Sequence, residues 1–303
     1  MVTVPPPIAP TEERNARTHQ IDRLPTLQIL ELINAEDATV ATAVATVLPD
    51  LAEAVDCSVD ALRSGHRLHY FGAGTSGRMA VLDATELRPT YGVEPGRVVA
   101  HLAGGLRALT DAVEAAEDDA DTGAATATAA LTAGDVAFGI TASGGTPFVG
   151  GALRAARDRG ARTVLLSANP EAPLAAHADI HIAVDTGPEV VTGSTRMKAG
   201  TAQKLVLNAL STAVMIRLGR TYSNLMTDMV ASNAKLRVRQ VRMLVQATGL
   251  PADTCQKALT AAGDEAKVAL LTLLTRADVD EARQALRAAG GVVHRALHAV
   301  RVY

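Results

Sequence analysis

Residues 67–86, RLHYFGAGTSGRMAVLDATE, constrain the possible fold more than any other part of this chain. Residues 68–71 are apolar or favour β structure, so they predict a short buried strand. A glycine turn follows, and then Thr75 and Ser76 open an apolar helical pattern. A helix that starts this way directs backbone N–H groups and its positive end at one place. The stretch therefore predicts an anion site at Gly74, Thr75 and Ser76.

The same glycines also satisfy a dinucleotide-binding pattern. Gly72, Gly74 and Gly77 fit G-x-G-x-x-G, which requires an acidic residue at the end of the next strand to hold a ribose. The next strand-like run, 97–102, is followed by Ala-Gly-Gly instead. The pattern therefore favours a phosphorylated small molecule over a nicotinamide cofactor.

Composition excludes several classes of protein. The 303 residues are 48% hydrophobic and 20% charged, which is typical of a folded globular chain. A net charge of −3 and only 2% aromatic residues give no basis for binding nucleic acid. Cys57 and Cys255 lack the spacing of a metal site, and no signal peptide or membrane span is visible. We therefore expect a reduced, cytoplasmic protein that does not bind a membrane.

Strand and helix patterns alternate after residue 67. Four further strands are expected, at 97–102, 135–140, 163–167 and 180–184. Helical patterns separate or flank them, at 24–35, 41–64, 109–119 and 148–159 and from the end of a hydroxyl-rich loop at 193–201 to about residue 218. This alternation predicts an α/β domain with a parallel sheet. The expected division is an N-terminal segment at 1–50, an α/β domain at 51–225, and a helical C-terminal subdomain at 233–303.

Three loops rich in glycine and hydroxyl residues follow strands or open helices: the first at 72–76, the second at 141–147 and the third at 193–201. Ligands in parallel α/β folds bind at the carboxyl ends of the strands, where such loops lie. Three loops of this kind favour a phosphate or sugar-phosphate ligand over three simple helix caps. The expected ligand-binding residues are Gly74, Thr75, Ser76, Ser143, Gly144, Thr146, Ser194, Thr195 and Lys198.

The N-terminal residues contain a dense polar group. The chain is proline-rich up to about Pro10, and we expect that part to lack structure of its own. The plain interpretation of TEERN, residues 11–15, is a helix start with Thr11 as N-cap and with Arg14 and Asn15 in solvent.

Two pairs of acidic residues are candidates for acid–base chemistry. Asp83 and Glu86 lie one turn apart on the first helix, and Glu114 and Glu117 show the same spacing. Acidic residues on helices most often lie on solvated faces. Glu86 has apolar neighbours, so partial burial would raise its pKa and suit it to act as an acid. The eight histidines are scattered and predict no metal site.

Four stretches resemble the N-acetylmuramic acid 6-phosphate etherase family: GAGTSGRMAVLDATELRPTYG (72–92), AVEAAED (112–118), GPEVVTGSTRMKAGTAQKLVLNALST (187–212) and NLMTDMVASNAKLRVRQV (224–241). TEERN resembles the N-terminal motif of that family. The resemblance covers nearly the whole chain. It implies a sugar isomerase (SIS) domain with helical segments at both ends, a homodimer, and cleavage of a D-lactyl ether in cell-wall amino sugar recycling.

The resemblance also implies roles for two glutamates. In the family, elimination is followed by hydration, with no metal or redox cofactor. Glu86 matches the acid that assists departure of lactate, and Glu117, rather than Glu114, matches the second catalytic glutamate. The chain departs from the family at Gly145, where arginine is common. Arg78, Arg196 and Lys198 are the candidates to replace that cation.

Two rival functions use a similar fold. One is a non-catalytic sugar-phosphate sensor, as in the related glucokinase regulatory protein, and the other is a sugar-phosphate isomerase. The presence of both Glu86 and Glu117 favours the etherase.

Overall fold

The computed structural model describes residues 9–229 and 234–300, and two compact units are apparent within it. The first contains residues up to 84 together with 96–211, and the second contains 85–95 and the chain from 212 onward. Each unit is thus assembled from separate stretches of chain, whereas the three-part division expected above follows chain order. Most of the proline-rich start and the expected helix start at Asn233 lie outside the described residues.

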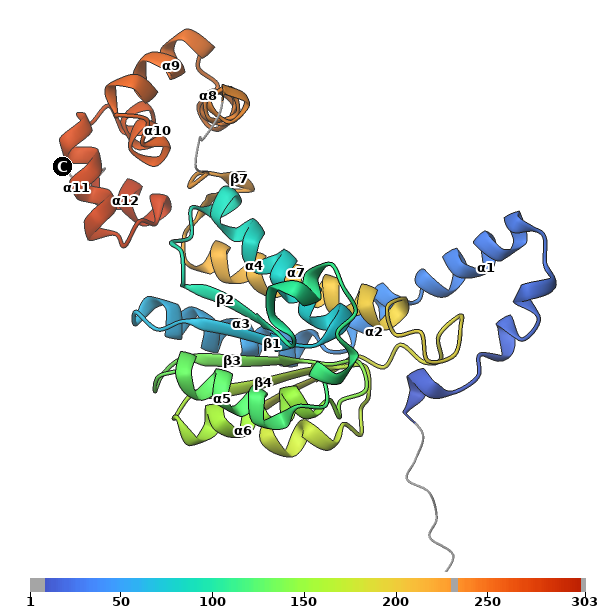
Figure 1. Ribbon diagram of the computed structural model, residues 1–303. Coiled ribbons are helices and arrows are strands. Elements are labelled where there is room, and N and C mark those ends of the chain that lie inside the picture. The colour runs from blue at the N-terminus through green and yellow to red at the C-terminus, as the bar shows by residue number, and fades with distance from the viewer. Residues whose placement is uncertain (1–8, 230–233, 301–303) are drawn as a thin grey trace, which may run out of the picture. The chain divides into compact units, whose positions relative to one another are not determined.

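The first unit contains a parallel sheet of five strands (Figure 1). The strands are β1 (Leu68–Gly72), β2 (Val98–Leu102), β3 (Val136–Ile140), β4 (Arg162–Ser167) and β5 (Ile180–Ala183), in the order β2-β1-β3-β4-β5. All neighbouring pairs are parallel. The predicted α/β fold and all five expected strands are therefore confirmed.

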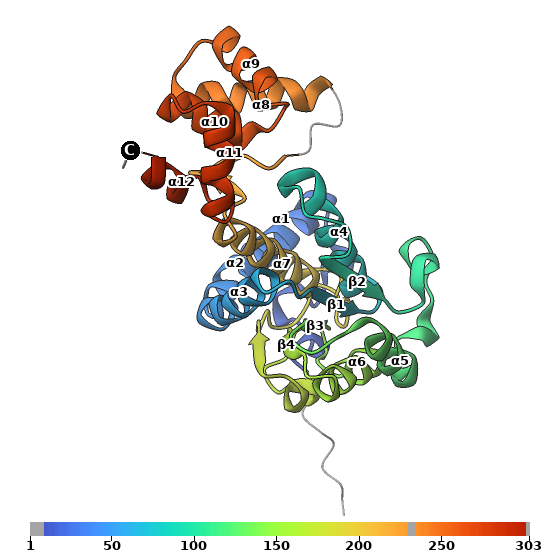
Figure 2. The ribbon, with the colours of Figure 1, turned by 90° about the vertical axis from the view of Figure 1, so that its left-hand side faces the viewer.

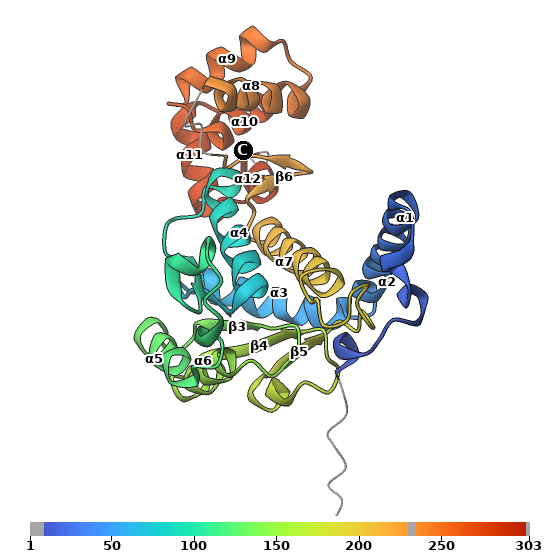
Figure 3. The same cartoon turned by 45° about the vertical axis from the view of Figure 1, so that its right-hand side comes forward.

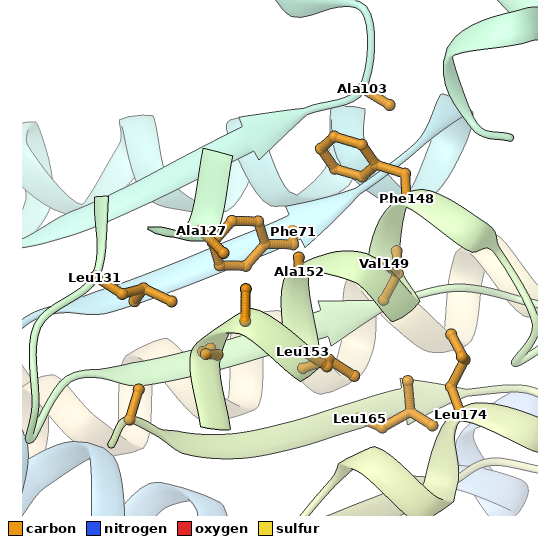
Figure 4. Packing of buried hydrophobic residues seen from close by; sticks show 14 of the residues in the cluster. Phe71, Ala103, Ala127, Leu131, Phe148, Val149, Ala152, Leu153, Leu165 and Leu174 are labelled. Atoms are coloured by element: carbon orange, nitrogen blue, oxygen red, sulfur yellow. The ribbon is translucent and has the colours of Figure 1, made fainter. Parts of the chain in front are cut away.

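Helices cover both faces of this sheet (Figure 2). One face carries α3 (Leu48–Arg63), the first part of α4 (Gly74–Tyr91) and α7 (Lys198–Arg217), and the other carries α5 (Ala120–Ala130) and α6 (Pro147–Asp158). Every residue of β1 and β3 is buried, as expected for central strands covered on both sides. Phe71 of β1 lies in one hydrophobic core cluster with Ala127 of α5 and Phe148 of α6 (Figure 4).

The strand order creates a switch point between β1 and β3. The chain leaves β1 towards β2 on one side, then returns to place β3 on the other side. Gly72, the last residue of β1, is level with Ile140 at the end of β3 and with Leu102 at the end of β2. Ligands of doubly wound folds bind in the crevice outside such a point. The loops that follow β1 and β3 are therefore placed to share a ligand.

The N-terminal part consists of three 3₁₀ turns and two helices. These are η1 (Pro10–Glu12), η2 (Ala16–Thr18), η3 (Ile21–Arg23), α1 (Thr26–Asp37) and α2 (Val40–Ala45). The helix expected over 41–64 is two helices, α2 and α3, separated after Ala45 and resumed at Leu48.

The second unit contains a helical subdomain. A short antiparallel pair, β6 (Thr221–Tyr222) and β7 (Leu225–Met226), precedes α8 (Ala234–Thr248), α9 (Ala252–Ala261), α10 (Ala266–Thr275), α11 (Val279–Ala288) and α12 (Val293–Val300). Leu244, Leu259 and Leu270 are among the residues of its own hydrophobic core. The expected helical C-terminal part is therefore confirmed.

The helices were compared with the length and composition that a membrane span needs. Over 9–229 and 234–300, no single helix combines the length and apolar composition needed to cross a bilayer. The bent pair Thr26–Ala45 and Leu48–Arg63 meets that test only when its two parts are taken together.

The prediction of a helix over 109–119 is wrong. The structure has two short 3₁₀ turns there, η4 (Gly105–Leu109) and η5 (Glu114–Ala116). Gly104 and Gly105 both have positive φ, at 81° and 65°, so the backbone turns sharply before η4. A further 3₁₀ turn, η6 (Pro173–His177), follows β4. The sequence places Pro89 and Gly92 at the end of the first helix; Pro89 lies inside α4, but α4 does end at Tyr91, directly before Gly92, whose φ is 61°.

Candidate functional site

The first loop places the start of α4 very close to β1. A Cβ on Gly77 would lie 2.6 Å from the carbonyl oxygen of Gly72 and 2.3 Å from Leu102 Cδ1. Glycine is therefore needed at the third position of G-x-G-x-x-G for helix–strand packing, whichever ligand binds. Gly74 has a φ of 52° and is exposed, while Thr75 is half-buried and Ser76 is buried. Because α4 begins directly after β1, its N-terminal N–H groups lie at the carboxyl end of the sheet, which is the place where the sequence predicts an anion site.

The second loop is a network of hydroxyl groups at the end of β3. Thr141 Oγ1 lies 2.7 Å from Thr146 Oγ1 and 3.4 Å from Ser143 Oγ. The N–H of Gly144 donates to Thr141, and that of Gly145 donates to Ser143. The structure thus unites the predicted Ser143, Gly144 and Thr146 around Thr141, which sequence reasoning did not select. Its position directly after a buried strand was the available signal.

Two glycines of the second loop have different surroundings. Gly144 has a φ of 76°, and a Cβ there would lie 2.3 Å from the Cβ of Ala172, so no other residue fits. A Cβ on Gly145 would meet only Ser143 Oγ, at 3.9 Å. The departure from arginine at Gly145 therefore leaves open space beside the hydroxyl network.

The third loop is close to the first. A Cβ on Gly200 in α7 would lie 3.4 Å from the methyl carbon of Thr75. Ser194 and Thr195, just before α7, are half-buried. The structure therefore brings the predicted residues of the first and third loops to the same end of the sheet.

The N-terminus of α7 is already occupied by a side chain. The buried carboxylate of Glu189 accepts the backbone N–H groups of Lys198 and Ala199, at 2.9 and 3.0 Å. Burial raises the pKa of Glu189, and these N–H bonds partly oppose that increase. Because a carboxylate satisfies the positive end of this helix, the third loop can offer a ligand its hydroxyl groups but not the first N–H groups of α7.

Lys198 lies in a buried ion pair. Its Nζ is 2.9 Å from Glu36 Oε2, and Arg17 Nε binds the other carboxylate oxygen. Burial disfavours the ionised form of Glu36, but its hydrogen bonds with Arg17 and Lys198 outweigh that effect and lower its pKa to about 2. The ammonium predicted to bind ligand is therefore engaged with Glu36, 162 residues earlier in the chain.

TEERN packs on the third loop and is not a solvated helix start (Figure 3). The carbonyl of Thr11 accepts the N–H of Gly193, and Asn15 Nδ2 donates to the carbonyl of Pro188. The prediction of Thr11 as an N-cap is wrong, since Thr11 lies inside η1 and is fully buried. Asn15 is also buried, and its side chain caps η2 by accepting the N–H of Arg17.

Glu117 follows η5 in the segment that replaces the expected helix. Its side chain is exposed, and its carbonyl accepts the N–H of Phe148 in the first turn of α6 at 3.0 Å. Its spacing from Glu114 is therefore not one turn of an α-helix, because a 3₁₀ turn intervenes. The backbone bond joins Glu117 to the helix that follows the second loop.

Glu86 lies on α4, as predicted, but its side chain is exposed rather than partly buried. The buried residue of this pair is Asp83, one turn earlier. Tyr70 Oη and Ser211 Oγ donate to its carboxylate at 3.0 and 2.8 Å. Burial raises the pKa of Asp83 to about 6 despite these two bonds. The buried carboxylate of this pair is therefore Asp83 and not Glu86.

Comparisons with known proteins agree with this architecture. Two family models match: the glucokinase regulatory protein N-terminal SIS domain over residues 50–157 and the SIS domain over 109–213. A solved phosphoheptose isomerase from Francisella tularensis has a TM-score of 0.50 at 20% identity, covering 63% of this chain and 98% of its own. At that identity the likeness shows the fold alone.

Curated relatives are much more similar in sequence. The N-acetylmuramic acid 6-phosphate etherase of Thermobifida fusca is 61% identical over 267 residues, which are 88% of each chain. The protein of that name from Brucella anthropi is 51% identical over 95% of this chain and 94% of its own. The resemblance of the four motifs is therefore matched along almost the entire sequence. This chain belongs to the N-acetylmuramic acid 6-phosphate etherase family.

Proposed function

We propose that this protein cleaves the D-lactyl ether of N-acetylmuramic acid 6-phosphate, giving N-acetylglucosamine 6-phosphate and D-lactate. The observation that carries the proposal is the 61% identity to the Thermobifida fusca etherase over 88% of both chains. The three loops at the carboxyl end of the sheet support it, because they offer hydroxyl and N–H donors suited to a sugar phosphate. This activity also places the protein in cell-wall amino sugar recycling.

The sugar phosphate binds, in this proposal, where the first and second loops meet at the switch point. Thr75 and Ser76 begin α4, and the hydroxyl network of the second loop lies at the neighbouring strand end. The third loop adds Ser194 and Thr195, while Lys198 contributes indirectly by holding Glu36. The full set of binding residues proposed is Gly74, Thr75, Ser76, Ser143, Gly144, Thr146, Ser194, Thr195 and Lys198.

The chemistry proposed is elimination and then hydration. The sugar ring opens to an aldehyde at C1, which acidifies the proton at C2. Glu117 removes that proton, and the electron pair forms a C2–C3 double bond as the C3–O bond breaks. Glu86 protonates the departing lactate oxygen, and water then adds across the double bond. Two carboxyl groups with opposed protonation states are enough for these proton transfers.

Both glutamates are exposed in the single chain, which bears on the proposed homodimer. A carboxylate is a weak base towards carbon, so its reaction requires accurate placement and removal of water. We infer that a second copy of the chain and the substrate supply that cover. Oligomeric state in solution, measured by light scattering, tests the inference, and a fully active monomer would contradict it.

Among the candidates, Arg196 is best placed to supply the positive charge of the arginine that is common in the family at the position of Gly145. The guanidinium of Arg78 donates to the carbonyls of Ala108 and Asp111, and Lys198 is paired with Glu36. Arg196 is exposed and lies between the third-loop hydroxyls and α7. We therefore propose that Arg196, rather than Arg78 or Lys198, compensates for the glycine.

The cytoplasmic location, which rests partly on free Cys57 and Cys255, stays a prediction.

The test is release of D-lactate from N-acetylmuramic acid 6-phosphate by purified protein without added cofactor. Wild-type protein is expected to release D-lactate, and Glu86→Gln and Glu117→Gln are expected to stop release while unfolding at the wild-type temperature. A chelator is expected to leave the rate unchanged. Near wild-type turnover in either variant would overturn the role of that glutamate.

The same sample separates the two rival functions. A sensor would bind N-acetylmuramic acid 6-phosphate and leave it intact, whereas an isomerase would interconvert an aldose and a ketose phosphate without producing lactate. Either result from folded wild-type protein would overturn the etherase proposal.

A further inference from the structure

The guanidinium of Arg78 joins α4 to the segment that carries Glu117. Arg78 Nε donates to the carbonyl of Ala108 at 2.9 Å, and Nη2 donates to the carbonyl of Asp111 at 3.0 Å. The two acceptors lie at the end of η4 and just beyond it, within segment 104–119, which contains 3₁₀ turns and no α-helix. A single side chain thus holds two backbone positions of that segment.

The position of Arg78 is itself fixed by the packing of α4. Its neighbour Gly77 lies directly against the end of β1 and against Leu102, where a Cβ would not fit. Ala103, immediately after β2, donates its N–H to the carbonyl of Gly72 at 3.0 Å. The start of segment 104–119 and the backbone of α4 next to Arg78 are therefore both held in place by the ends of β1 and β2.

The other end of the segment is fixed by α6. Glu117 accepts the N–H of Phe148 through its carbonyl, and Ala116 packs against the core that contains Phe148. Between these ends the segment has only short 3₁₀ turns, which supply few backbone hydrogen bonds of their own. Its conformation therefore depends on bonds from outside, and Arg78 provides two of them.

We propose that Arg78 is a positioning residue for Glu117, holding the 104–119 segment so that the glutamate meets C2 of the sugar. This inference rests on the proposed etherase function and deepens it. The Arg78 guanidinium acts through the carbonyls of Ala108 and Asp111 and not by contact with the substrate phosphate.

The chemistry of arginine suits this task. Its planar fork presents several N–H donors in fixed directions, so it can satisfy two carbonyls at once, and charge strengthens each bond. Lysine carries the same charge but concentrates it at one atom on a flexible stem. Arg78→Lys is therefore expected to keep the local charge and lose the two-point hold.

The experiment compares Arg78→Lys and Arg78→Ala with Arg107→Ala. Arg107 lies on the same segment, but its side chain is exposed and pairs only weakly with the Asp111 carboxylate at 3.4 Å. Since a displacement of about 1 Å can cost on the order of 100-fold in rate, we expect both Arg78 variants to lose roughly that factor in kcat. KM is expected to change by less than about threefold, because phosphate binding is not removed. Arg107→Ala is expected to retain wild-type kcat and KM.

Two readouts distinguish positioning from general destabilisation. Amide hydrogen exchange in peptides covering 104–119 is expected to speed up in the Arg78 variants and not in Arg107→Ala. Exchange of the C2 proton of N-acetylglucosamine 6-phosphate in D₂O, followed by NMR, is expected to slow in parallel with kcat. The rate of that exchange measures removal of the C2 proton by Glu117 and does not require cleavage of an ether.

Three results would overturn the inference. A large rise in KM with unchanged kcat would show that Arg78 binds the phosphate directly. Unchanged kcat and KM in both Arg78 variants would show that the two hydrogen bonds from Arg78 are not needed for the reaction. A wild-type rate of C2 exchange in Arg78→Lys, with lactate release reduced, would place the defect elsewhere. If wild-type protein released no D-lactate, the proposed function would fail instead, before any variant was compared.

Discussion

Lys198 Nζ and Glu36 Oε2 lie 2.9 Å apart, and the side chains that carry them are 1% and 3% exposed. The pair joins the first turn of α7 to the end of α1, and Arg17 binds the same carboxylate from η2. The N-terminal part of the chain and the third loop are thus connected by charge in a place that water scarcely reaches.

Glu36→Gln is expected to destabilise the protein by about 3–5 kcal/mol, because it leaves the Lys198 ammonium buried without a counter-charge. Glu53→Gln is the matched control, since Glu53 forms an exposed pair with Arg162 at 3.3 Å and its loss should cost at most about 1 kcal/mol. Chemical denaturation of the two variants makes the comparison. Equal losses of stability would contradict a special role for the buried pair.

The contribution of Glu36 should disappear in acid. Its pKa is lowered from 4.5 to about 2 in the folded protein, so the folded state binds the proton less tightly than the unfolded state. The stabilisation is therefore complete above pH 4.5 and is lost as the pH falls towards 2. Unfolding curves at several pH values should show wild type and Glu36→Gln converging over that range. If the difference in stability between wild type and Glu36→Gln stayed constant over that pH range, the ionised carboxylate of Glu36 would not be the source of the stabilisation.

Asp83 should show the opposite dependence. Burial raises its pKa from 3.8 to about 6, although Tyr70, Ser211 and the charge of Lys204 oppose the increase. The folded state then holds the proton more tightly, so stability falls as the pH rises from about 3.8 through 6. A shift of this size corresponds to a loss on the order of 3 kcal/mol. Asp83→Asn should lack this component, and parallel pH profiles of the two proteins would contradict it.

Gly77→Ala is expected to destabilise the α/β unit by about 1–3 kcal/mol or more, because the new Cβ would overlap Leu102 and the Gly72 carbonyl. Gly145→Ala is a suitable control: the nearest atom to its Cβ is 3.9 Å away, so we expect a change within about 0.5 kcal/mol. Thermal unfolding of both variants provides the measurement. A neutral Gly77→Ala would show that α4 can move away from β1 at little cost.

Thr146→Val is expected to weaken sugar-phosphate binding. It removes one hydroxyl of the network at Thr141, and a lost hydrogen bond of about 1.4 kcal/mol corresponds to about tenfold in affinity. Thr128→Val on α5 is the control, since Thr128 is exposed and its hydroxyl donates to the carbonyl of Ala124 within its own helix. Calorimetric titration with N-acetylglucosamine 6-phosphate would detect the difference. Equal affinities would exclude the second loop from the ligand site.

The sheet was predictable because its signals are local. Each strand is a short buried run bounded by glycine or polar residues, and the central strands are covered on both faces, as their near-continuous apolar sequence indicates. The helix starts after the first two loops were visible for a similar reason, since glycine, hydroxyl residues and Pro147 lie within a few positions of one another. Neither prediction requires knowledge of a distant partner.

The wrong predictions involve long-range contacts. The spacing of Leu109, Val113 and Ala116 favours a helix, yet bonds from Arg78 and from the N–H of Phe148 hold that segment in another shape. TEERN looked like a solvated helix start because Asn15 and Pro188 are 173 residues apart. One sequence cannot show which distant carbonyl a side chain will meet, so both the engagement of Lys198 and the burial of Asn15 were missed.

The contacts of Arg17, Asn15 and Thr11 have a practical consequence for anyone trimming this protein. A version shortened to begin at α1 would retain every strand and every α-helix described for the first unit. It would still lose one of the two cations that neutralise Glu36 and the residues that form hydrogen bonds with Gly193 and Pro188. The residues ahead of the first α-helix are therefore part of the folded first unit, although they contain only 3₁₀ turns.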